Sequence, residues 1–282
     1  MTGNFLHKSI DRIKSKMRRE HVAQRGLRRL LSVFPPLDFP ARFLAGLNFK
    51  WTIPTDGTEH DLKKYRVYPL IAWFNYHQHE VLGKQCKWLG KRALKNPLDA
   101  WIYQEIIWEV RPDLIIELGN KNGGSTLFLA NICDLIGHGE ILALDLDHKQ
   151  FTAEHSRIRL LTGDCSSEPV LNKVREYAKN KKVLVIHDAD HTRKAVLRDL
   201  RLYAEFVSPC SYLIVEDTMH GISGFNSESG KKPGVFTLRD PDTPLQAIEE
   251  FLKERRDFTM DRSRERYILT SNYKGYLRRK PD

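Results

Sequence analysis

Short apolar runs alternate with helix-like segments from residue 99 to the C-terminus, and this alternation restricts the possible folds more than any other feature of the chain. Five mostly apolar runs have the length of buried strands, at residues 114–118, 141–144, 158–161, 183–186 and 212–215. Segments of helical character lie between or beside them, at about 100–110, 125–136, 168–179, 192–206 and 243–255. Strands that are apolar throughout and joined by helices pair in parallel, with helices on both faces of the sheet. The sequence therefore predicts an α/β fold.

Three details complete the expected fold. Asp99 is expected to cap the first helix. Only about a dozen residues separate the second and third strands, too few for a crossover helix with its loops, so a turn is expected there. The segments 258–260 and 267–270 are expected to form a terminal antiparallel hairpin. Together with the five parallel strands they predict a mostly parallel, seven-stranded sheet for a domain at 99–282.

The N-terminal part of the chain differs in composition from the rest. The chain carries a net charge of +10, and its first 50 residues hold eleven Lys and Arg against three Asp and Glu. Residues 1–40 are predicted to form a basic amphipathic helical arm, a type of segment that lies on anionic membrane surfaces or docks on a partner. Residues 41–98 are rich in aromatic side chains and are expected to cap the domain and shape a substrate pocket.

The remaining composition restricts the class of protein. No apolar run approaches the roughly 20 residues of a membrane-spanning helix. The four cysteines form no CxxC pair and the N-terminus lacks the apolar core of a signal peptide, which favours a cytoplasmic protein with reduced thiols. Contact with a membrane is expected only at its surface, through the arm. No nucleic-acid recognition motif is visible, so no specific nucleic-acid partner is expected. The protein is expected to form a homo-oligomer.

Polar residues follow every one of the five predicted parallel strands. The first strand leads into Glu117 and a glycine-rich turn, and the next ones end at Asp145, Asp164, Asp188 and the pair Glu216–Asp217. Ligands of open parallel sheets bind beyond the carboxyl ends of the strands. The sequence therefore predicts a binding site at this edge of the sheet.

The glycine-rich turn predicts the kind of ligand. Its glycines, at 119, 123 and 124, match neither the GxGxxG dinucleotide motif nor a phosphate-binding P-loop. A carboxylate at Glu117 suits a cationic nucleoside without phosphates, such as S-adenosylmethionine. Asp145 is placed to bind ribose hydroxyls, and Asp164 with Cys165 to bind the adenine edge. The predicted cofactor-binding residues are Glu117, Gly119, Asn122, Gly123, Ser125, Asp145, Asp164, Cys165 and Asp188. Alternatively, the glycines only permit tight packing and Asp145 caps a turn.

A second group of residues predicts a metal site. The carboxylates of Asp188, Glu216 and Asp217 should converge at adjacent strand ends, where they repel one another unless a cation lies between them. Oxygen ligands favour Mg²⁺, with Mn²⁺ or Ca²⁺ as alternatives. His191 is the candidate to accept a proton from a metal-bound hydroxyl, and His187 is expected to point away. Alternatively, these acids face solvent or cap helices, and His191 caps the next helix.

Several of these motifs together resemble the cephalosporin hydroxylase family, over roughly residues 86–275. The matching stretches are Trp101–Ile107, Pro112–Gly119, Gly123–Ser125, Asp188–His191 and Leu213–Thr218. The resemblance implies the Rossmann-like fold of class I S-adenosylmethionine-dependent methyltransferases, and the family includes rhamnosyl O-methyltransferases. It implies an Mg²⁺ site at Asp188, Glu216 and Asp217, and cofactor contacts at Glu117, Gly119, Ser125, Asp145 and Asp164. This chain departs from the family at Asn122, where members often carry an aromatic residue.

The expected function is therefore Mg²⁺-dependent O-methyl transfer from S-adenosylmethionine to a hydroxyl of a sugar, glycolipid or natural product. Asp188 and His191 are the expected catalytic residues. Two alternatives stay open at this point. The first is a non-haem iron hydroxylase that uses His187, His191 and His220. The second is a non-catalytic protein that binds the cofactor or serves as a scaffold.

Overall fold

A computed structural model describes residues 77–219 and 242–282 of the chain. The predicted arm at 1–40, most of the predicted cap at 41–98, and His220 lie outside the described residues. The chain divides into two units, residues 1–50 and 51–282, and every described residue belongs to the second unit. Among the described residues, no helix has the length and apolar character needed to cross a membrane.

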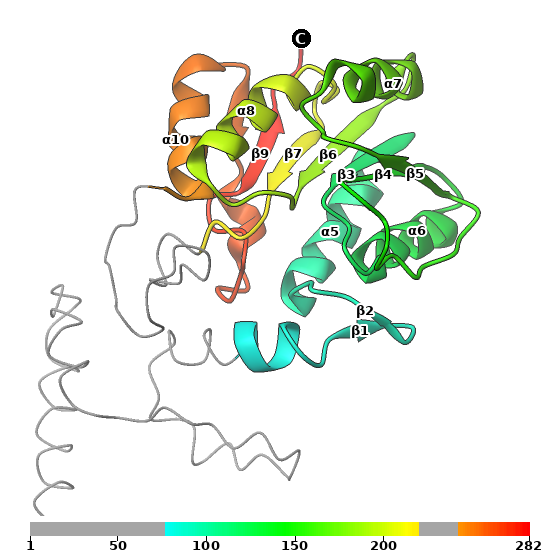
Figure 1. Ribbon diagram of the computed structural model, residues 1–282. Helices are drawn as coiled ribbons and strands as arrows, with labels where there is room; N and C mark the ends of the chain where they lie inside the picture. Colours follow the sequence, from blue (N-terminus) through cyan, green and yellow to red (C-terminus); the bar gives the residue numbers. More distant parts are fainter. Residues whose placement is uncertain (1–76, 220–241) are drawn as a thin grey trace, which may run out of the picture. The chain divides into compact units, whose positions relative to one another are not determined.

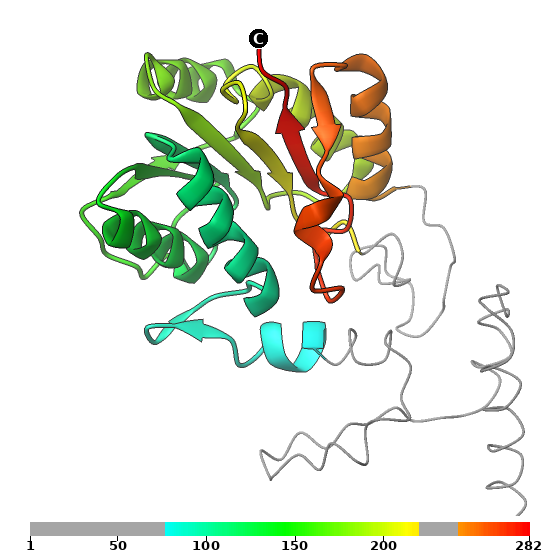
Figure 2. The same ribbon diagram turned by 180° about the vertical axis from the view of Figure 1, so that it is seen from behind.

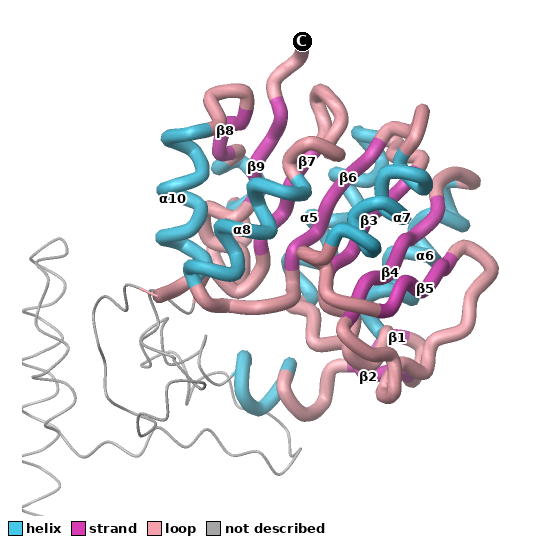
Figure 3. The backbone as a smooth tube through the Cα atoms, turned by 45° about the horizontal axis from the view of Figure 1, so that its top comes forward, coloured by secondary structure: helices cyan, strands magenta, loops and turns pink. Residues whose placement is uncertain are grey.

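A seven-stranded sheet forms the centre of the second unit (Figure 3). Its strands, in chain order, are β3 (Leu114–Leu118), β4 (Glu140–Asp145), β5 (Ile158–Thr162), β6 (Val183–His187), β7 (Tyr212–Val215), β8 (Phe258–Met260) and β9 (Tyr276–Arg279). Their order across the sheet is β5-β4-β3-β6-β7-β9-β8, and neighbouring strands from β5 to β7 pair in parallel. Strand β9 pairs antiparallel with both β7 and β8. The predicted mostly parallel sheet with an antiparallel end is confirmed.

Helices cover both faces of this sheet (Figures 1 and 2). One face packs against α5 (Pro97–Val110) and α6 (Gly124–Ile136), the other against α7 (Glu168–Ala178), α8 (Arg193–Tyr203) and α10 (Pro244–Glu254). Successive side chains of a strand point to opposite faces, so Ile115 belongs to the first apolar cluster and Leu114 and Ile116 to the second. No helix lies between β4 and β5, which confirms the predicted turn.

Short elements precede and follow the sheet. A π-helical segment, η1 (His77–Leu82), leads into a two-stranded hairpin of β1 (Lys87–Trp88) and β2 (Lys91–Arg92), and a 3₁₀ turn, η2 (Arg262–Glu265), follows β8. The hairpin rests on α6: the Trp88 ring meets Phe128 edge-on with centroids 5.0 Å apart, and Trp88 Nε1 donates to Asn131 Oδ1 at 2.8 Å. The described end of the 41–98 segment thus packs against α6.

The prediction of the hairpin's second strand was wrong. The partner of β8 is β9, at Tyr276–Arg279, and not the apolar run 267–270. Ile268 is 69% exposed, whereas Tyr276 and Leu277 are fully buried against the sheet. The run 267–270 instead leads into a buried polar segment, Thr270 to Asn272, that contacts the start of α5. Apolar character alone did not distinguish a short loop from an edge strand.

The predicted cap of α5 was also wrong by three residues. Asn96 caps this helix, because its side chain accepts from the Leu98 N–H and Pro97 occupies the first turn, where a missing N–H costs nothing. Asp99 lies inside the first turn and is buried. Its carboxylate accepts from Thr270 Oγ1 at 2.5 Å, the Ser271 N–H at 2.7 Å and Tyr276 Oη at 2.9 Å. Asp99 therefore joins α5 to the segment before β9.

This buried carboxylate predicts a pH dependence of stability. Burial raises the pKa of Asp99 from 3.8 to about 6, although its hydrogen bonds oppose that rise. Between pH 4 and 6 the folded state keeps a proton that the unfolded state has lost, so Asp99 makes the protein less stable as the pH rises. The full change amounts to about 3 kcal/mol. Asp99→Asn should remove this component from the pH dependence of the unfolding free energy, measured in urea from pH 4 to 8. Identical slopes in both proteins would contradict the expectation.

Candidate active site

The polar strand ends meet at one cavity, as the sequence predicted for the carboxyl edge of the sheet. The cavity has a volume of about 810 Å³ and is lined from β3, β4, β5, β6 and β7 and the loops that follow them. Of the predicted site residues, those in its wall are Gly119, Asn122, Ser125, Asp145, Asp164, Cys165, Asp188, His191 and Asp217. Three others, Glu117, Gly123 and Glu216, are outside the lining and lie beneath or beside it.

Glu117 organises the glycine-rich turn from below. It is fully buried, and its carboxylate accepts from Ser125 Oγ at 2.7 Å, Thr126 Oγ1 at 2.5 Å and Asn120 Nδ2 at 2.8 Å. Burial raises the pKa of Glu117, against the opposing charge of Lys95. The hydroxyl donors come from the first turn of α6, so Glu117 ties the end of β3 to the start of that helix. Its place in the structure is that of a support for the turn.

Gly119 allows the turn to approach the next strand. Its φ is +83°, in the left-handed region, and a Cβ at this position would lie 2.0 Å from the carbonyl oxygen of Asp188. Only glycine fits such a conformation at this contact. The backbone of the turn therefore runs directly beside the end of β6, which brings the two predicted half-sites together.

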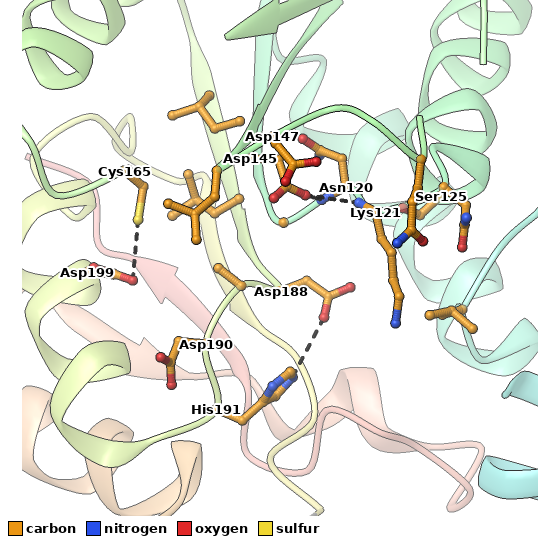
Figure 4. A pocket seen from close by; sticks show the side chains of 18 of the residues that line it. Asn120, Lys121, Ser125, Asp145, Asp147, Cys165, Asp188, Asp190, His191 and Asp199 are labelled. Atoms are coloured by element: carbon orange, nitrogen blue, oxygen red, sulfur yellow. Dashed lines mark hydrogen bonds and ion pairs between the residues drawn. The ribbon is translucent and has the colours of Figure 1, made fainter. Parts of the chain in front are cut away.

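Asp145, at the end of β4, and Asp164, two residues after β5, both line the cavity. Asp145 Oδ2 accepts from the N–H groups of Asn120 at 2.8 Å and Lys121 at 3.0 Å, so this carboxylate holds the glycine-rich turn (Figure 4). Asp164 Oδ1 accepts from the Ser166 N–H and hydroxyl, both at 2.8 Å, and these hydrogen bonds lower the pKa of Asp164. Hydrogen bonds thus fix the orientation of both carboxylates in the wall.

Cys165, in the cavity wall, and the buried His187 both contact Asp199, which also lines the cavity. Cys165 Sγ lies 3.6 Å from Asp199 Oδ2, and His187 Nε2 lies 3.1 Å from the same oxygen. Burial raises the pKa of Cys165 to about 12, so its thiol stays protonated. His187 points to α8 and away from the metal-site candidates, as strand alternation predicted.

Three predicted residues converge at the ends of β6 and β7. Asp188, His191 and Asp217 each offer a ligand atom, and these atoms lie within 4.8 Å of one another. His191 Nε2 is 3.0 Å from Asp217 Oδ2. The same nitrogen is 3.9 Å from Asp188 Oδ1 (Figure 4). Asp217 adopts a left-handed φ of +56° that a side chain rarely takes, which turns its carboxylate toward the other two.

The charge at this cluster fits a divalent cation. Burial and the charge of Glu216 raise the pKa of Asp188 well above its ordinary value. A neighbouring positive charge is what such a carboxylate needs to stay ionised. The carboxylates of Asp188 and Asp217 supply oxygen ligands, the type that Mg²⁺ and Mn²⁺ prefer. A two-histidine, one-carboxylate iron set is not formed here, because His191 is the one imidazole of this cluster among the described residues.

Glu216 lies apart from that cluster. It is 5% exposed, and its Oε1 accepts from Lys95 Nζ and, at 2.6 Å, from Tyr103 Oη. Lys95 Nζ also lies 3.7 Å from Asp188 Oδ2. Lys95 and Tyr103 were absent from the predicted site. A lysine directly before the Asn96–Pro97 start of a helix gives no sequence signal for burial.

Comparisons with known proteins identify the family of this chain. The family model described as rhamnosyl O-methyltransferase/CmcI matches residues 81–280. The rhamnosyl O-methyltransferase of Mycobacterium leprae (strain TN) is 32% identical over 201 residues, which are 68% of this chain and 82% of that protein. The rhamnosyl O-methyltransferase of Mycobacterium bovis (strain BCG / Pasteur 1173P2) is 30% identical over 223 residues, 76% of this chain and 86% of that protein.

A solved structure of CmcI with Mg and SAM shares the fold, with a TM-score of 0.55 at 22% identity, over 88% of this chain and 98% of that chain. The predicted Rossmann-like methyltransferase fold and the resemblance to the cephalosporin hydroxylase family are therefore confirmed. The family model covers more than half of the chain and includes every residue of the cavity discussed above. This protein belongs to the rhamnosyl O-methyltransferase/CmcI family.

Proposed function

We propose that this protein transfers a methyl group from S-adenosylmethionine to a hydroxyl group of a sugar, with a divalent metal ion, Mg²⁺, at Asp188 and Asp217. One observation supports this proposal above the others. The glycine-rich turn and the Asp188, His191 and Asp217 cluster face the same cavity of about 810 Å³. That volume lies within the usual range of ligand pockets and suits a nucleoside beside an acceptor.

The cofactor end of the cavity is built to bind a nucleoside without phosphates. The backbone of Gly119 is exposed to a ligand because no side chain covers it, and Ser125 and Asn122 lie beside it. Asp145 and Asp164 offer carboxylates at the ends of β4 and β5, where ribose hydroxyls and an adenine amino group find acceptors. Glu117 and Gly123 support the turn from outside the cavity wall.

The metal end of the cavity would position the acceptor. Asp188 and Asp217 would hold the ion. The predicted third ligand, Glu216, forms an ion pair with Lys95 instead. A bound Mg²⁺ polarises a hydroxyl and lowers its pKa, while the sulfonium cofactor supplies an electrophilic methyl group. The chain's own task is to fix both reactants close together, which by itself can lower the barrier substantially.

His191 is the proposed general base. Its Nε2 would take the hydroxyl proton as the acceptor oxygen bonds to the methyl carbon and the sulfur leaves as a thioether. Asp217 Oδ2, 3.0 Å from that nitrogen, would stabilise the imidazolium that forms. The proton thus moves to a group that already faces the cavity.

The class of sugar follows from the relatives. Proteins named rhamnosyl O-methyltransferases are 30 to 32% identical to this chain, so a rhamnosyl hydroxyl is the proposed acceptor group. We extend the proposal to a glycolipid carrier, because the basic arm at residues 1–40 suits an anionic membrane surface. This extension rests on the sequence of the arm, which lies outside the described residues.

Methyl transfer with labelled cofactor tests the proposal. The full chain would be incubated with S-adenosylmethionine labelled in its methyl group and a panel of free sugars, rhamnosides, rhamnosyl glycolipids and catechols, with Mg²⁺ or with a chelator. Mass spectrometry should find the label on a rhamnosyl oxygen, and the chelator should suppress it. Labelling that ignores the chelator would refute the metal's role, and labelling of catechols alone would refute the sugar acceptor.

A further inference from the structure

Lys95 is a buried lysine between two of the acidic residues of the site. It is 5% exposed, its Nζ donates to Glu216 Oε1, and the same nitrogen lies 3.7 Å from Asp188 Oδ2. The ammonium also stands 5.1 Å from the centre of the Tyr103 ring. A buried ammonium persists only where counter-charges compensate its lost hydration. Here those counter-charges are carboxylates proposed to serve a metal ion or to stand beside one.

The backbone around Lys95 is anchored on both sides. Cys86 Sγ donates to the Lys95 carbonyl oxygen at 3.4 Å. The next residue, Asn96, caps α5, and its Nδ2 donates to the Leu269 carbonyl oxygen at 2.9 Å. The ammonium is therefore a resident of the site, tethered by its stem to a fixed point of the fold.

Glu216 is held on the Lys95 side by a second donor. Its Oε1 accepts from Tyr103 Oη at 2.6 Å, and Tyr103 Oη in turn accepts from Asn272 Nδ2 at 3.3 Å. The ligand atoms of Asp188, His191 and Asp217 gather within 4.8 Å of one another, and Glu216 is outside that group. Lys95 thus occupies the place between Glu216 and Asp188 where a cation would be attracted by both.

We propose that Lys95 is a positioning residue that acts as a resident counter-cation and competes with the divalent ion for the charge of Asp188 and Glu216. This inference rests on the proposed function, because it concerns the metal of that function. Two cations that neutralise the same carboxylates weaken each other's binding by Coulomb repulsion, which is strong at a few ångströms in a partly buried site. Lys95 thereby keeps the metal affinity low and holds the acidic cluster together when no ion is bound.

The variant Lys95→Gln tests the competition. Titration calorimetry of Mg²⁺, and separately of Mn²⁺, into the full chain should show binding at least about tenfold tighter than in the wild type. The variant without metal should have a lower Tm, and Mg²⁺ should raise that Tm by more than it does in the wild type. Metal binding that is unchanged or weaker would overturn the proposal. Lys181→Gln is the matched control. Lys181 Nζ lies 2.6 Å from Glu140 Oε1, and neither residue lines the cavity. The metal affinity of this variant should equal that of the wild type.

The double variant Lys95→Gln with Glu216→Gln decides the matter should the single variant fail to fold. It removes one charge of each sign and replaces a buried ion pair by a neutral pair, which proteins tolerate well. Its metal affinity should stay within about threefold of the wild type, because the positive charge that opposes the ion and the negative charge that attracts it disappear together. A loss of tenfold or more would show that Lys95 opposes the ion far less than Glu216 attracts it, and would overturn the proposal.

Asp188→Asn separates this proposal from the proposed function. If Asp188→Asn binds Mg²⁺ as well as the wild type does, the site has no metal there, and both proposals fail. If Asp188→Asn abolishes binding while Lys95→Gln leaves it unchanged, the metal site stands and only the role of Lys95 is refuted. If Asp188→Asn loses Mg²⁺ binding and Lys95→Gln binds Mg²⁺ more tightly, the proposed function and the proposed role of Lys95 are both supported.

Discussion

Replacing Asp188 by Asn is expected to abolish divalent-ion binding and to lower the rate of methyl transfer by about 10³-fold or more, since a metal that stabilises developing charge contributes several kcal/mol. Asp188 directly follows the central strand β6 and is the residue shared by the metal cluster and the contact with the Gly119 turn. Asn keeps the shape of the side chain but carries no charge. Calorimetry with Mg²⁺ and a labelled-methyl assay would measure the two effects.

A control for this variant is Asp113→Asn. Asp113 lies just before β3, at the opposite end of the strand, where it accepts from the Lys182 N–H at 2.7 Å. The Asp113→Asn substitution also removes one negative charge, but outside the cavity lining, and should leave metal binding and methyl transfer unchanged. Transfer by Asp188→Asn at the wild-type rate, in the presence of a chelator, would refute the proposed metal site.

Replacing His191 by Gln is expected to lower kcat by about 10²- to 10⁴-fold, the usual contribution of a general base. The affinity for S-adenosylmethionine should not change, because His191 is not among the predicted cofactor-binding residues. The affinity for Mg²⁺ should change by less than about threefold, since Asp188 and Asp217 supply the carboxylates. Steady-state kinetics and calorimetry separate these quantities.

His138→Gln is the matched control for an imidazole. His138 pairs with Asp113 at 3.0 Å, outside the cavity lining, and its loss should leave kcat unchanged. A large loss of Mg²⁺ affinity in His191→Gln, with kcat restored at saturating metal, would reassign His191 from base to ligand. An unchanged kcat would remove it from the mechanism altogether.

Much of the fold was predictable because it depends on local patterns. The apolar runs of β3, β4, β6 and β7 are buried on both faces of the sheet, and such runs are visible in the sequence. The run of the edge strand β5 is only partly buried. The short link between β4 and β5 follows from the number of residues alone. The polar residues at the strand ends, from Glu117 to Asp217, also follow from order along the chain, because parallel strands bring their carboxyl ends to one edge.

The incorrect predictions concern contacts between residues far apart in sequence. Asp99 was expected to cap α5, but Thr270 and Ser271 bind its carboxylate from a segment 171 and 172 residues away. The run 267–270 was expected to pair with 258–260 in a hairpin, but β8 pairs with Tyr276–Arg279 instead. In both cases the local sequence suggested one partner, and the fold supplied another from elsewhere in the chain.

The sequence by itself determined the α/β sheet and the edge at which the chemistry lies, because apolar runs and chain order carry that information. Only the tertiary structure decided what surrounds each acidic side chain. It placed Asp188 and Asp217 with His191, and gave Glu216 to Lys95, 121 residues earlier in the chain. The physical reason is that the charge state and the partner of a buried carboxylate depend on which groups the fold brings within a few ångströms of it, and sequence spacing does not encode those distances.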